Sequence, residues 1–286
     1  MLNLETVKTI AYLGPQASFT EMAKDYFCKK FNISAYPTPL QTIRQVVEYV
    51  DDTPNSLGVL AVENSIEGTV RESMVTKNPN IRILAEYFMP ISHCLLARTT
   101  EFSSITNVIS HPQALAQCQD FIHNELPFNV NIIEASSTAE AAKSLQNYNL
   151  TYSAIGSKKT AETYNLNVLK EGINDDKTNQ TRFILIGDFE TDKTENDKTS
   201  MAFSTENKPG ALLSVLEIFM ANHINLSYIA SRPSKHKFGE YIFIVNFDGH
   251  IHDPKILHTI QQIKEKTTYI RFLGSYKKSK AIVLQP

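Results

Sequence analysis

Two kinds of hydrophobic pattern alternate along the first 187 residues of the chain. Short runs of branched and aromatic residues, such as 57–62 and 182–187, have the length and composition of buried strands. Longer segments between them, such as 19–31, carry apolar residues three and four positions apart, which is the spacing of an amphipathic helix. Strands that alternate with helices in this way predict α/β layers with largely parallel sheets.

The expected elements of this region are defined by their residue ranges. Strands are predicted at 7–13, 57–62, 81–97, 105–110, 130–135, 152–156 and 182–187. Helices are predicted at 19–31, 39–50, 68–75, 112–126 and 137–148. No internal repeat or low-complexity segment interrupts this order.

The pattern changes after residue 187. Residues 188–200 are polar and charged without apolar periodicity, which is typical of a linker or an exposed turn. The elements predicted beyond this segment are strand 199–205, helix 209–223, strand 224–231, strand 239–247, helix 253–266 and strand 269–276. This βαββαβ order is that of the ferredoxin-like split motif. We therefore expect a first region at 1–187, a linker at 188–198 and an α+β domain at 199–286.

Composition narrows the class of protein. A length of 286 residues favours two domains, and 42% hydrophobic with 20% charged residues is ordinary for a soluble protein. Lys and Arg number 28 against 30 Asp and Glu, so the net charge of -2 gives no field that would attract nucleic acid. No apolar run approaches the roughly 20 residues that span a bilayer, and the first residues lack the pattern of a signal peptide. We expect a cytoplasmic protein with neither nucleic acid nor membrane as a partner.

The three cysteines give no sign of a disulfide framework or of a metal site. They are odd in number, far apart and without a C-x-x-C pair, which suits a reducing compartment. His93 beside Cys94, and Cys118 between His111 and His123, could be drawn as metal ligands. A free cysteine is more often a small buried hydrophobe, so no metal is expected.

Four loops carry small polar residues where expected strands end, which is where ligands collect in α/β sheets. They cover residues 14–20, 63–70, 110–118 and 136–142. Each loop leads into an expected helix, so its Ser and Thr residues are candidate N-caps, and the free N–H groups of the helix start would face an anion. Helix capping alone would explain any one of them. The candidates are Ser18, Thr20, Ser65, Thr69, Ser137 and Thr138.

Two of these loops contain further polar candidates. Glu63 and Asn64 follow an apolar strand directly, although a simple connector needs only a turn former there, and a solvated turn remains the alternative. Gln117 shares a helix face with the glutamine four positions earlier, and Ser110 lies at the strand exit before them. His111 precedes a proline, which favours an extended turn residue over a general base.

Thr181 and Arg182 open an apolar run that looks like a buried strand. Arginine is almost never fully buried without a partner, and its planar fork of donors matches a carboxylate with two hydrogen bonds. A threonine hydroxyl can donate to a departing oxygen when the reaction supplies the driving force. We therefore expect this pair to face a dianionic substrate.

The segments YLGPQASFT, VENSIEGTV, SHPQALAQC, STAEAA and NQTRF, followed by GALLSVL and SRP, closely resemble monofunctional prephenate dehydratases almost end to end. The resemblance implies two α/β lobes similar to type II periplasmic binding proteins, roughly 1–80 with 165–187 and 81–164, followed by an ACT-type regulatory domain. It implies conversion of prephenate to phenylpyruvate, water and carbon dioxide in phenylalanine biosynthesis. No metal or other cofactor is implied.

The resemblance also implies roles for the candidate residues. Thr181 would act as general acid or hydrogen-bond donor to the leaving hydroxyl, Arg182 would hold a carboxylate, and Phe183 would line the pocket. Glu63 would support a network that orients substrate and donor through Asn64, Ser110 and Gln117. Anion-binding donors would come from Ser18, Ser65, Ser137 and Thr138. One departure is Ala17, where the family usually has glycine, so this loop is expected to follow a slightly different path.

For the ACT-type domain, the resemblance implies L-phenylalanine as effector, bound between paired domains of a homodimer or homotetramer. The residues concerned would be Gly210, Ala211, Leu212, Asn225, Ser231, Arg232 and Pro233. Ala230 stands where the family commonly has glutamate, which removes one partner for the ammonium group of the effector.

Two alternative functions remain open on the sequence alone. A two-lobed anion receptor with a sensor domain would need the arginine but has little need for the Thr181 hydroxyl. Dehydration of arogenate in place of prephenate would differ only by an amino group on the substrate side chain.

Overall fold

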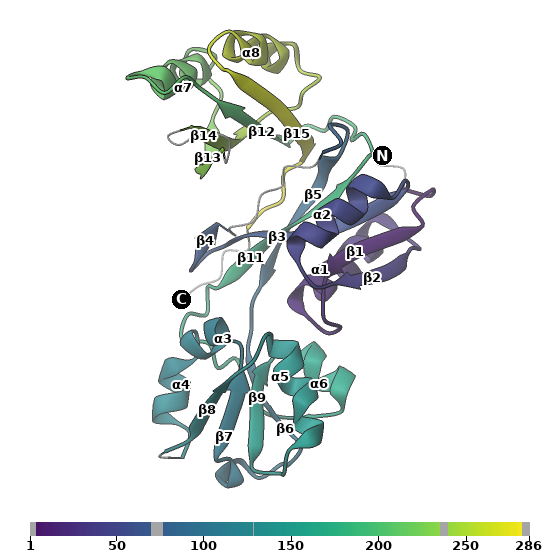
Figure 1. Cartoon of the computed structure of the whole chain (residues 1–286), viewed down its shortest axis with the longest axis vertical. Helices are drawn as coiled ribbons and strands as arrows, with labels where there is room; N and C mark the ends of the chain where they lie inside the picture. Colours follow the sequence, from purple (N-terminus) through teal and green to yellow (C-terminus); the bar gives the residue numbers. More distant parts are fainter. Residues whose placement is uncertain (1–3, 70–76, 128, 235–239, 282–286) are drawn as a thin grey trace.

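The structure, a computed structural model, describes residues 4–69, 77–127, 129–234 and 240–281 (Figure 1). Three β-sheets follow one another along the long axis of the molecule. Two mixed α/β sheets and a four-stranded antiparallel sheet of βαββαβ order confirm the predicted fold class. None of the helices in these described ranges has both the length and the apolar character needed to cross a membrane.

The first sheet lies in the middle of the molecule and, with its two helices, forms the first lobe (Figure 1). Its elements are β1 (Thr9–Leu13), α1 (Phe19–Phe31), β2 (Tyr36–Leu40), α2 (Ile43–Asp52), β3 (Ser56–Asn64), β4 (Gly68–Thr69), β5 (Arg82–Pro90) and β11 (Gln180–Gly187). The strand order is β2-β1-β3-β11-β5, parallel around β1 and antiparallel around β11. Helices α1 and α2 contribute to two separate core clusters that alternate strand residues also enter.

The second sheet and its helices form the second lobe. Its elements are β6 (Cys94–Ala97), β7 (Asn107–Ser110), α3 (Pro112–Ala116), α4 (Gln119–Asn124), β8 (Asn131–Glu134), α5 (Thr138–Ser144), β9 (Tyr152–Gly156), α6 (Lys158–Tyr164) and β10 (Asn167–Glu171), with short 3-10 turns at Phe102–Ser104 and Leu145–Asn147. The strand order is β10-β6-β9-β7-β8. The chain passes between the lobes twice, at 91–93 and at 172–179.

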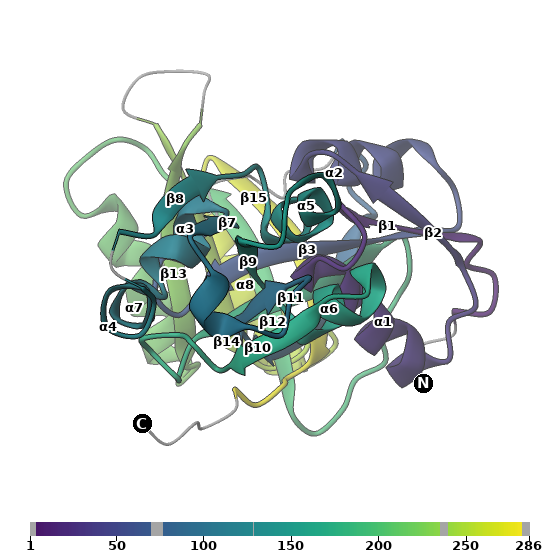
Figure 2. The ribbon, with the colours of Figure 1, turned by 90° about the horizontal axis from the view of Figure 1, so that it is seen from below.

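The third sheet is built by the last part of the chain. Its elements are β12 (Asp197–Ser204), α7 (Ala211–Ala221), β13 (Leu226–Pro233), β14 (Tyr241–Asp248), α8 (Pro254–Lys264) and β15 (Tyr269–Lys277). The order is β13-β14-β12-β15, with all pairs antiparallel, and both helices pack on the face turned away from the first lobe (Figure 1). Seen from below, β1 and β2 extend sideways beyond the other two sheets (Figure 2).

The apolar run predicted as one strand at 81–97 divides between the lobes. Its first part is β5 of the first sheet and its last part is β6 of the second. The division was not predicted because residues 91–93 are too short an interruption to indicate a change of sheet. Strand β10, which lay in the lobe expected at 165–187, pairs with β6 instead. The expected lobe boundaries therefore move to the two crossings at 91–93 and 172–179.

Other differences from the predicted elements have local causes. Strand β2 was not predicted because it contains two prolines, which a sheet tolerates at its edge. The helix predicted at 39–50 begins at Ile43, since the Thr42 hydroxyl and the Gln45 side chain form a capping box. The helix predicted at 68–75 is replaced at its start by β4, and its remaining residues lie outside the described part of the chain.

Ala17 does not divert its loop as expected. Its φ angle is 64°, the left-handed value that a glycine would take, and its side chain is buried. The Glu21 carboxylate holds this loop, accepting from the Ala17 N–H at 2.6 Å and from the Tyr12 hydroxyl at 2.7 Å. These two hydrogen bonds oppose the cost of the left-handed conformation, which is about 1–2 kcal/mol for a residue with a Cβ atom.

Candidate active site between the lobes

A cavity of about 590 Å³ lies between the first and second lobes. The first lobe contributes the β1–α1 loop, the end of β3 and the start of β11, whereas the second contributes the starts of α3 and α5. Apart from the start of β11, these are the positions where the sequence predicted ligand-binding loops. The volume is that of a typical small-molecule site.

The strand β11 presents Thr181 and Phe183 to this cavity. Arg182 lies between them and points to the opposite face, because successive side chains of a strand alternate. Its side chain is 7% exposed and ion-paired with Glu86, at 2.8 Å between Nε and Oε2. The expectation that Arg182 and Thr181 face the same substrate is therefore wrong: two neighbouring strand residues cannot share one face.

Glu63 is displaced from the cavity for the same reason. It lies on β3 one position before Asn64, pairs across the sheet with Arg182 and lies 3.7 Å from its guanidinium. Asn64 lines the cavity but Glu63 does not. The expected support from Glu63 to the substrate network is thus replaced by a contact with Arg182 on the other face.

The Asn64 side chain is held in one orientation. Its Oδ1 accepts hydrogen bonds from the backbone N–H groups of Ile66 and Glu67 at 3.0 and 3.1 Å. Because this oxygen only accepts, the Nδ2 group faces the other way and donates to Thr181 Oγ1 at 3.0 Å. A hydroxyl that accepts this bond keeps its own hydrogen for another acceptor. The Thr181 O–H can therefore donate into the cavity.

A chain of amides continues from Asn64 toward the second lobe. Asn64 Nδ2 also donates to Asn179 Oδ1 at 2.8 Å, so the Asn179 Nδ2 group faces Gln117 and donates to its Oε1 at 2.9 Å. His93 Nε2 lies 3.2 Å from the same Oε1 and must therefore carry its hydrogen. The buried Gln117 Nε2 group has no partner among the described residues.

Gln117 reaches this position because the helix predicted at 112–126 is broken there. Helix α3 ends at Ala116 and α4 begins at Gln119. The Asp175 carboxylate caps the second helix by accepting from the backbone N–H groups of Gln119 and Asp120 at 2.9 and 3.1 Å. Asp175 lies on a segment that crosses between the lobes, so the break in the helix is stabilised by a residue distant in sequence.

Burial lowers the pKa of His93, although its hydrogen bond to Gln117 acts in the opposite direction. The Nδ1 atom is buried without a partner among the described residues, so a proton there would have no acceptor. The imidazole is therefore neutral when the amide chain is intact.

We expect His93→Gln to reduce the loss of stability on acidification. Because the pKa of His93 is lowered by folding, the unfolded chain binds the proton first as the pH falls below the ordinary histidine value of about 6.5. Stability is therefore complete above that pH and is lost as the pH falls through the folded-state pKa. Urea unfolding of both proteins between pH 7.5 and 5 measures how the free energy of unfolding changes with pH. The same change in both proteins would contradict the prediction.

Ser18, Ser137 and Thr138 line the cavity at helix starts. The Ser18 hydroxyl caps α1 by accepting from the Glu21 N–H and donates to the Leu13 carbonyl, and the Ser137 hydroxyl caps α5. Their side chains are thus already engaged in the fold. The free N–H groups at the start of α1, with the positive end of its helix dipole, are suited to meet an anion in the cavity.

Ser65 and Ser110 do not line the cavity. The exposed Ser65 hydroxyl accepts from the backbone N–H of Gln180 at 2.9 Å, which ties the turn after β3 to β11. The Ser110 hydroxyl is fully buried and donates to the Ile155 carbonyl at 2.8 Å, so it joins β7 to β9. Their expected roles toward substrate are therefore not supported, because both hydroxyls serve sheet and turn contacts.

The apolar wall of the cavity is aromatic. Phe183 and Phe19 line it, and the Phe19 ring meets the His93 ring edge to face with centroids 5.6 Å apart. No lysine or arginine is among the described residues that line the cavity. Negative charge on a ligand there would be met by N–H groups of helix starts and amides.

Sequence reasoning missed three residues of this site: His93, Asn174 and Asn179. His93 was considered only as a metal ligand. Asn179 is the first residue of the segment NQTRF, from which only Thr181, Arg182 and Phe183 were chosen as site residues. Asn174 joins the two crossings by accepting from the His93 N–H at 2.7 Å and donating to the Ile91 carbonyl at 3.1 Å. For His93, the available signal was a polar residue that follows the apolar run of β5.

The residues expected to bind an effector lie on the third-sheet domain. Gly210 is the N-cap of α7 with φ of 80°, and no atom lies within 4 Å of where a Cβ would stand. Ala211 is buried, and Leu212 packs against the domain core. The remaining expected residues lie just before or on the edge strand β13: Asn225, Ser231, Arg232 and Pro233.

Comparisons with known proteins agree over the whole chain. Residues 10–191 match the family model described as prephenate dehydratase, and residues 199–265 match the one described as ACT domain. A bifunctional chorismate mutase/prephenate dehydratase of Aquifex aeolicus is 39% identical over 97% of this chain and 76% of that protein. A prephenate dehydratase of Methanocaldococcus jannaschii is 39% identical over 94% of this chain and 98% of that protein. The crystal structure of prephenate dehydratase from Arthrobacter aurescens in complex with L-Phe has a TM-score of 0.85 and 32% sequence identity. The match covers 97% of this chain and 93% of that one.

Proposed function

Because the chain belongs to the prephenate dehydratase family and is a carbon–oxygen lyase with an ACT domain, we propose that the inter-lobe cavity dehydrates prephenate with Thr181 as donor to the leaving hydroxyl. One observation carries this proposal. Asn64 donates to Thr181 Oγ1 and is held in that orientation by two backbone N–H groups, so the Thr181 hydroxyl keeps its hydrogen for an acceptor in the cavity.

The reaction needs a donor more than it needs a base. Electrons of the bond to the ring carboxylate move into the ring as carbon dioxide leaves, and the hydroxyl across the ring departs. One proton converts that hydroxide to water, so a prephenate dianion and a proton give phenylpyruvate, carbon dioxide and water. Thr181 stabilises the oxygen as its negative charge develops, and formation of the aromatic ring drives the step.

The polar lining is suited to position a substrate with two carboxylates. The unpartnered Gln117 Nε2 group and the start of α1 are separate donors on opposite lobes, so each can hold one carboxylate. Phe183 offers an apolar surface to the ring. We therefore assign substrate orientation to Asn64 and Gln117, and anion binding to the helix starts at Ser18 and Ser137.

The two alternatives differ from this proposal in a measurable product. Incubation of the purified protein with prephenate is expected to give phenylpyruvate, detected by its ultraviolet absorbance. Arogenate is expected to be turned over more slowly, because the donor groups described above favour a neutral keto side chain over an ammonium. Binding of prephenate without turnover would favour the sensor module, and faster turnover of arogenate would favour the arogenate dehydratase.

We also infer that L-phenylalanine regulates the enzyme by feedback from the ACT domain, which residues 188–198 join to the catalytic region. The open space beside Gly210 at the start of α7 supports this inference. An excess of phenylalanine is expected to raise the melting temperature and to lower the rate, since a ligand that binds only the folded state stabilises it.

Gly210→Ala is expected to weaken phenylalanine binding by at least tenfold, because the new methyl group enters the proposed site. Gly172→Ala is the matched control: Gly172 has φ of 63°, similar open space, and lies between the lobes, far from α7. Both substitutions strain a left-handed residue, so both cost about 1 kcal/mol of stability. The thermal shift with phenylalanine should fall only for Gly210→Ala, and equal shifts would contradict the proposed site.

A further inference from the structure

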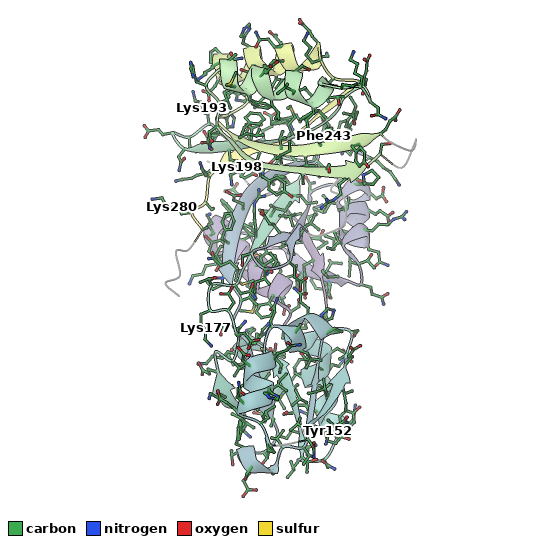
Figure 3. All side chains as sticks on the ribbon, turned by 90° about the vertical axis from the view of Figure 1, so that its left-hand side faces the viewer. Tyr152, Lys177, Lys193, Lys198, Phe243 and Lys280 are labelled. Carbon is green, nitrogen blue, oxygen red and sulfur yellow. The ribbon has the colours of Figure 1, made fainter. Side chains whose placement is uncertain are left out.

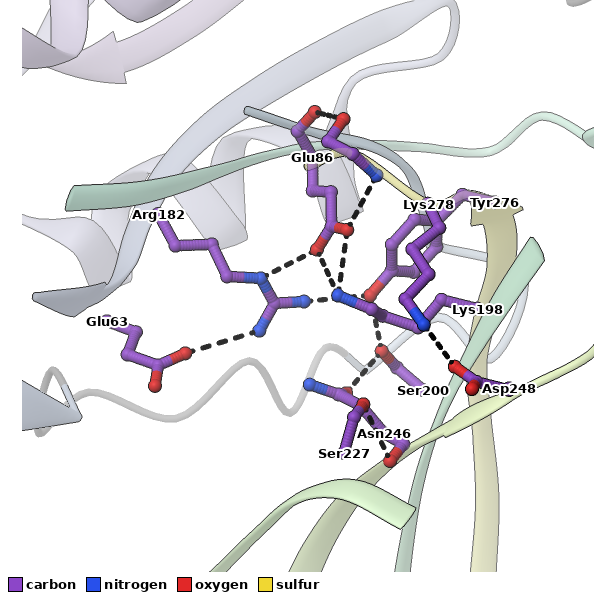
Figure 4. Close-up of polar contacts among 11 residues, drawn as sticks. Glu63, Glu86, Arg182, Lys198, Ser200, Ser227, Asn246, Asp248, Tyr276 and Lys278 are labelled. Atoms are coloured by element: carbon purple, nitrogen blue, oxygen red, sulfur yellow. Dashed lines mark hydrogen bonds and ion pairs between the residues drawn. The ribbon is translucent and has the colours of Figure 1, made fainter. Parts of the chain in front are cut away.

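A buried polar cluster joins the first lobe to the ACT domain (Figure 4). Glu86 of β5 accepts from Arg182 Nε at 2.8 Å and from Lys198 Nζ at 2.8 and 2.9 Å. Arg182 Nη2 donates to the Tyr276 hydroxyl at 2.8 Å. Two of these residues come from the catalytic region, whereas Lys198 of β12 and Tyr276 of β15 come from the ACT sheet. Figure 3 shows Lys198 on the side of that sheet turned to the first lobe.

The cluster is closed to water. Glu86 and Tyr276 are fully buried, and Arg182 and Lys198 are each 6% exposed. Ser200 lies 2.8 Å from the Tyr276 hydroxyl, and the Asn246 amide satisfies its neighbours when its oxygen accepts from Arg182 Nη1 at 3.1 Å. In so dry a site, the position of each charge is set by its partners.

The backbones of the two domains also meet beside the cluster. Gly274 of β15 has φ of 138°, and a Cβ there would overlap the Ile83 backbone of β5. After β15, the Ser279 N–H donates to Glu86 Oε1 and the Ser279 hydroxyl to the Glu86 carbonyl, at 3.0 and 2.8 Å. A shift of the ACT sheet against β5 would therefore move the partners of Arg182.

Arg182 connects this cluster to the cavity because it is the residue after Thr181 on β11. The peptide between them is held on both sides, since Thr181 pairs with Asn64 and Met89, and Arg182 with Glu63 and Phe88. The Arg182 guanidinium lies on the ACT side of the sheet and the Thr181 hydroxyl on the cavity side. A shift of about 1 Å that misaligns a catalytic group can lower the reaction rate by about a hundredfold.

We propose that Arg182 is a positioning residue for Thr181 and that the ACT domain sets its position through Lys198 and Tyr276. The proposal rests on the role given above to the Thr181 hydroxyl. Docking of the ACT sheet completes the partners of Glu86 and Arg182, and this fixes the end of β11 against Asn64. The ACT domain thus helps to align the Thr181 hydroxyl. An effector that alters the docking of this domain changes the reaction rate through the polar cluster.

The test measures kcat and KM for prephenate in full-length Lys198→Met, made both in the native protein and in Thr181→Val. Arg182 remains to neutralise Glu86, so the variant leaves no lone buried anion. We expect kcat to fall about tenfold in the native background with KM within about twofold, and no further loss in the Thr181→Val background. Lys198→Arg, which keeps the charge, should recover most of the rate.

Lys278→Met is the matched control, because its ammonium is paired with Asp248 within the ACT domain at 2.7 Å. An effect of Lys198→Met no larger than that of this control would overturn the proposal, and so would an equal loss in both backgrounds, which indicates a general structural role. If the native protein lacks turnover, or Thr181→Val retains it, the role given to Thr181 fails instead.

Tyr276→Phe provides a second test if Lys198→Met does not fold. It keeps the buried ring and removes only the hydroxyl that Arg182 and Ser200 contact. A loss of about threefold in kcat is expected in the native background and none with Thr181→Val. Tyr269→Phe, on the same strand but 37% exposed, is its control, and equal rates for both variants would overturn the proposal.

Discussion

Replacing Thr181 with valine is expected to lower kcat for prephenate by roughly a hundred- to a thousandfold, with KM changed by less than about threefold. Valine has nearly the shape of threonine but cannot donate to the leaving oxygen, and it deprives Asn64 Nδ2 of the acceptor 3.0 Å away. Binding of the two carboxylates depends on other donors, so the loss falls on the chemical step.

Steady-state kinetics of Thr181→Val and Thr181→Ser check this result. Serine keeps the hydroxyl and loses only a methyl group, so it should retain at least about a tenth of the native kcat through the same hydrogen bond. A valine variant with near-native turnover would remove Thr181 from the mechanism. A serine variant as slow as valine would show that the methyl group, and hence packing, is what matters.

Glu86→Gln is expected to have the largest effect on stability, about 3–5 kcal/mol, because it leaves two buried cations without their carboxylate. Glu86 is fully buried and is ion-paired with Arg182 and Lys198, each at 2.8 Å. Glutamine is similar in size and can still accept hydrogen bonds, so the change is mainly one of charge. Urea unfolding monitored by circular dichroism measures the free energy of unfolding.

The exposed pair of Glu171 with Lys158 provides the control. Glu171→Gln should leave the unfolding midpoint unchanged, because water already solvates both partners. Adding Lys198→Met to Glu86→Gln should restore part of the stability, since one of the two uncompensated cations is then gone. A Glu86→Gln protein as stable as the native one would mean that the cluster is hydrated in solution.

Much of the fold could be predicted because its signals are local. Helix α1 has the bounds 19–31 that its apolar spacing predicted, and the last six elements follow in the βαββαβ order. Errors arose where the deciding contact was distant in sequence. Only the three residues 91–93 separate β5 from β6, too few to predict a change of sheet, and the helix at 112–126 is interrupted with the help of Asp175, more than fifty positions later.

In the candidate site, too, local signals gave correct predictions and distant contacts caused the errors. Thr181 and Asn64 were found because they flank apolar runs and Gln117 because of its helix face, and all three line the cavity. Arg182 was expected to face the substrate because a guanidinium suits a carboxylate, and Glu63 because it lies beside Asn64 where an apolar strand ends. The alternation of strand β11 was available as a signal against that assignment, but the partner on the far face was not.

The sequence by itself determined most of the elements, their order, the family and the residue types that face a ligand, because periodicity, turn residues and motifs act over short distances along the chain. Only the tertiary structure decided which side of each sheet faces the cavity and what covers the other side. Thr181 and Arg182 are neighbours in sequence, yet one meets Asn64 in the cavity and the other meets Glu86 and the ACT domain. The physical reason is that side-chain direction follows from strand pairing and sheet packing, which join residues far apart in the chain.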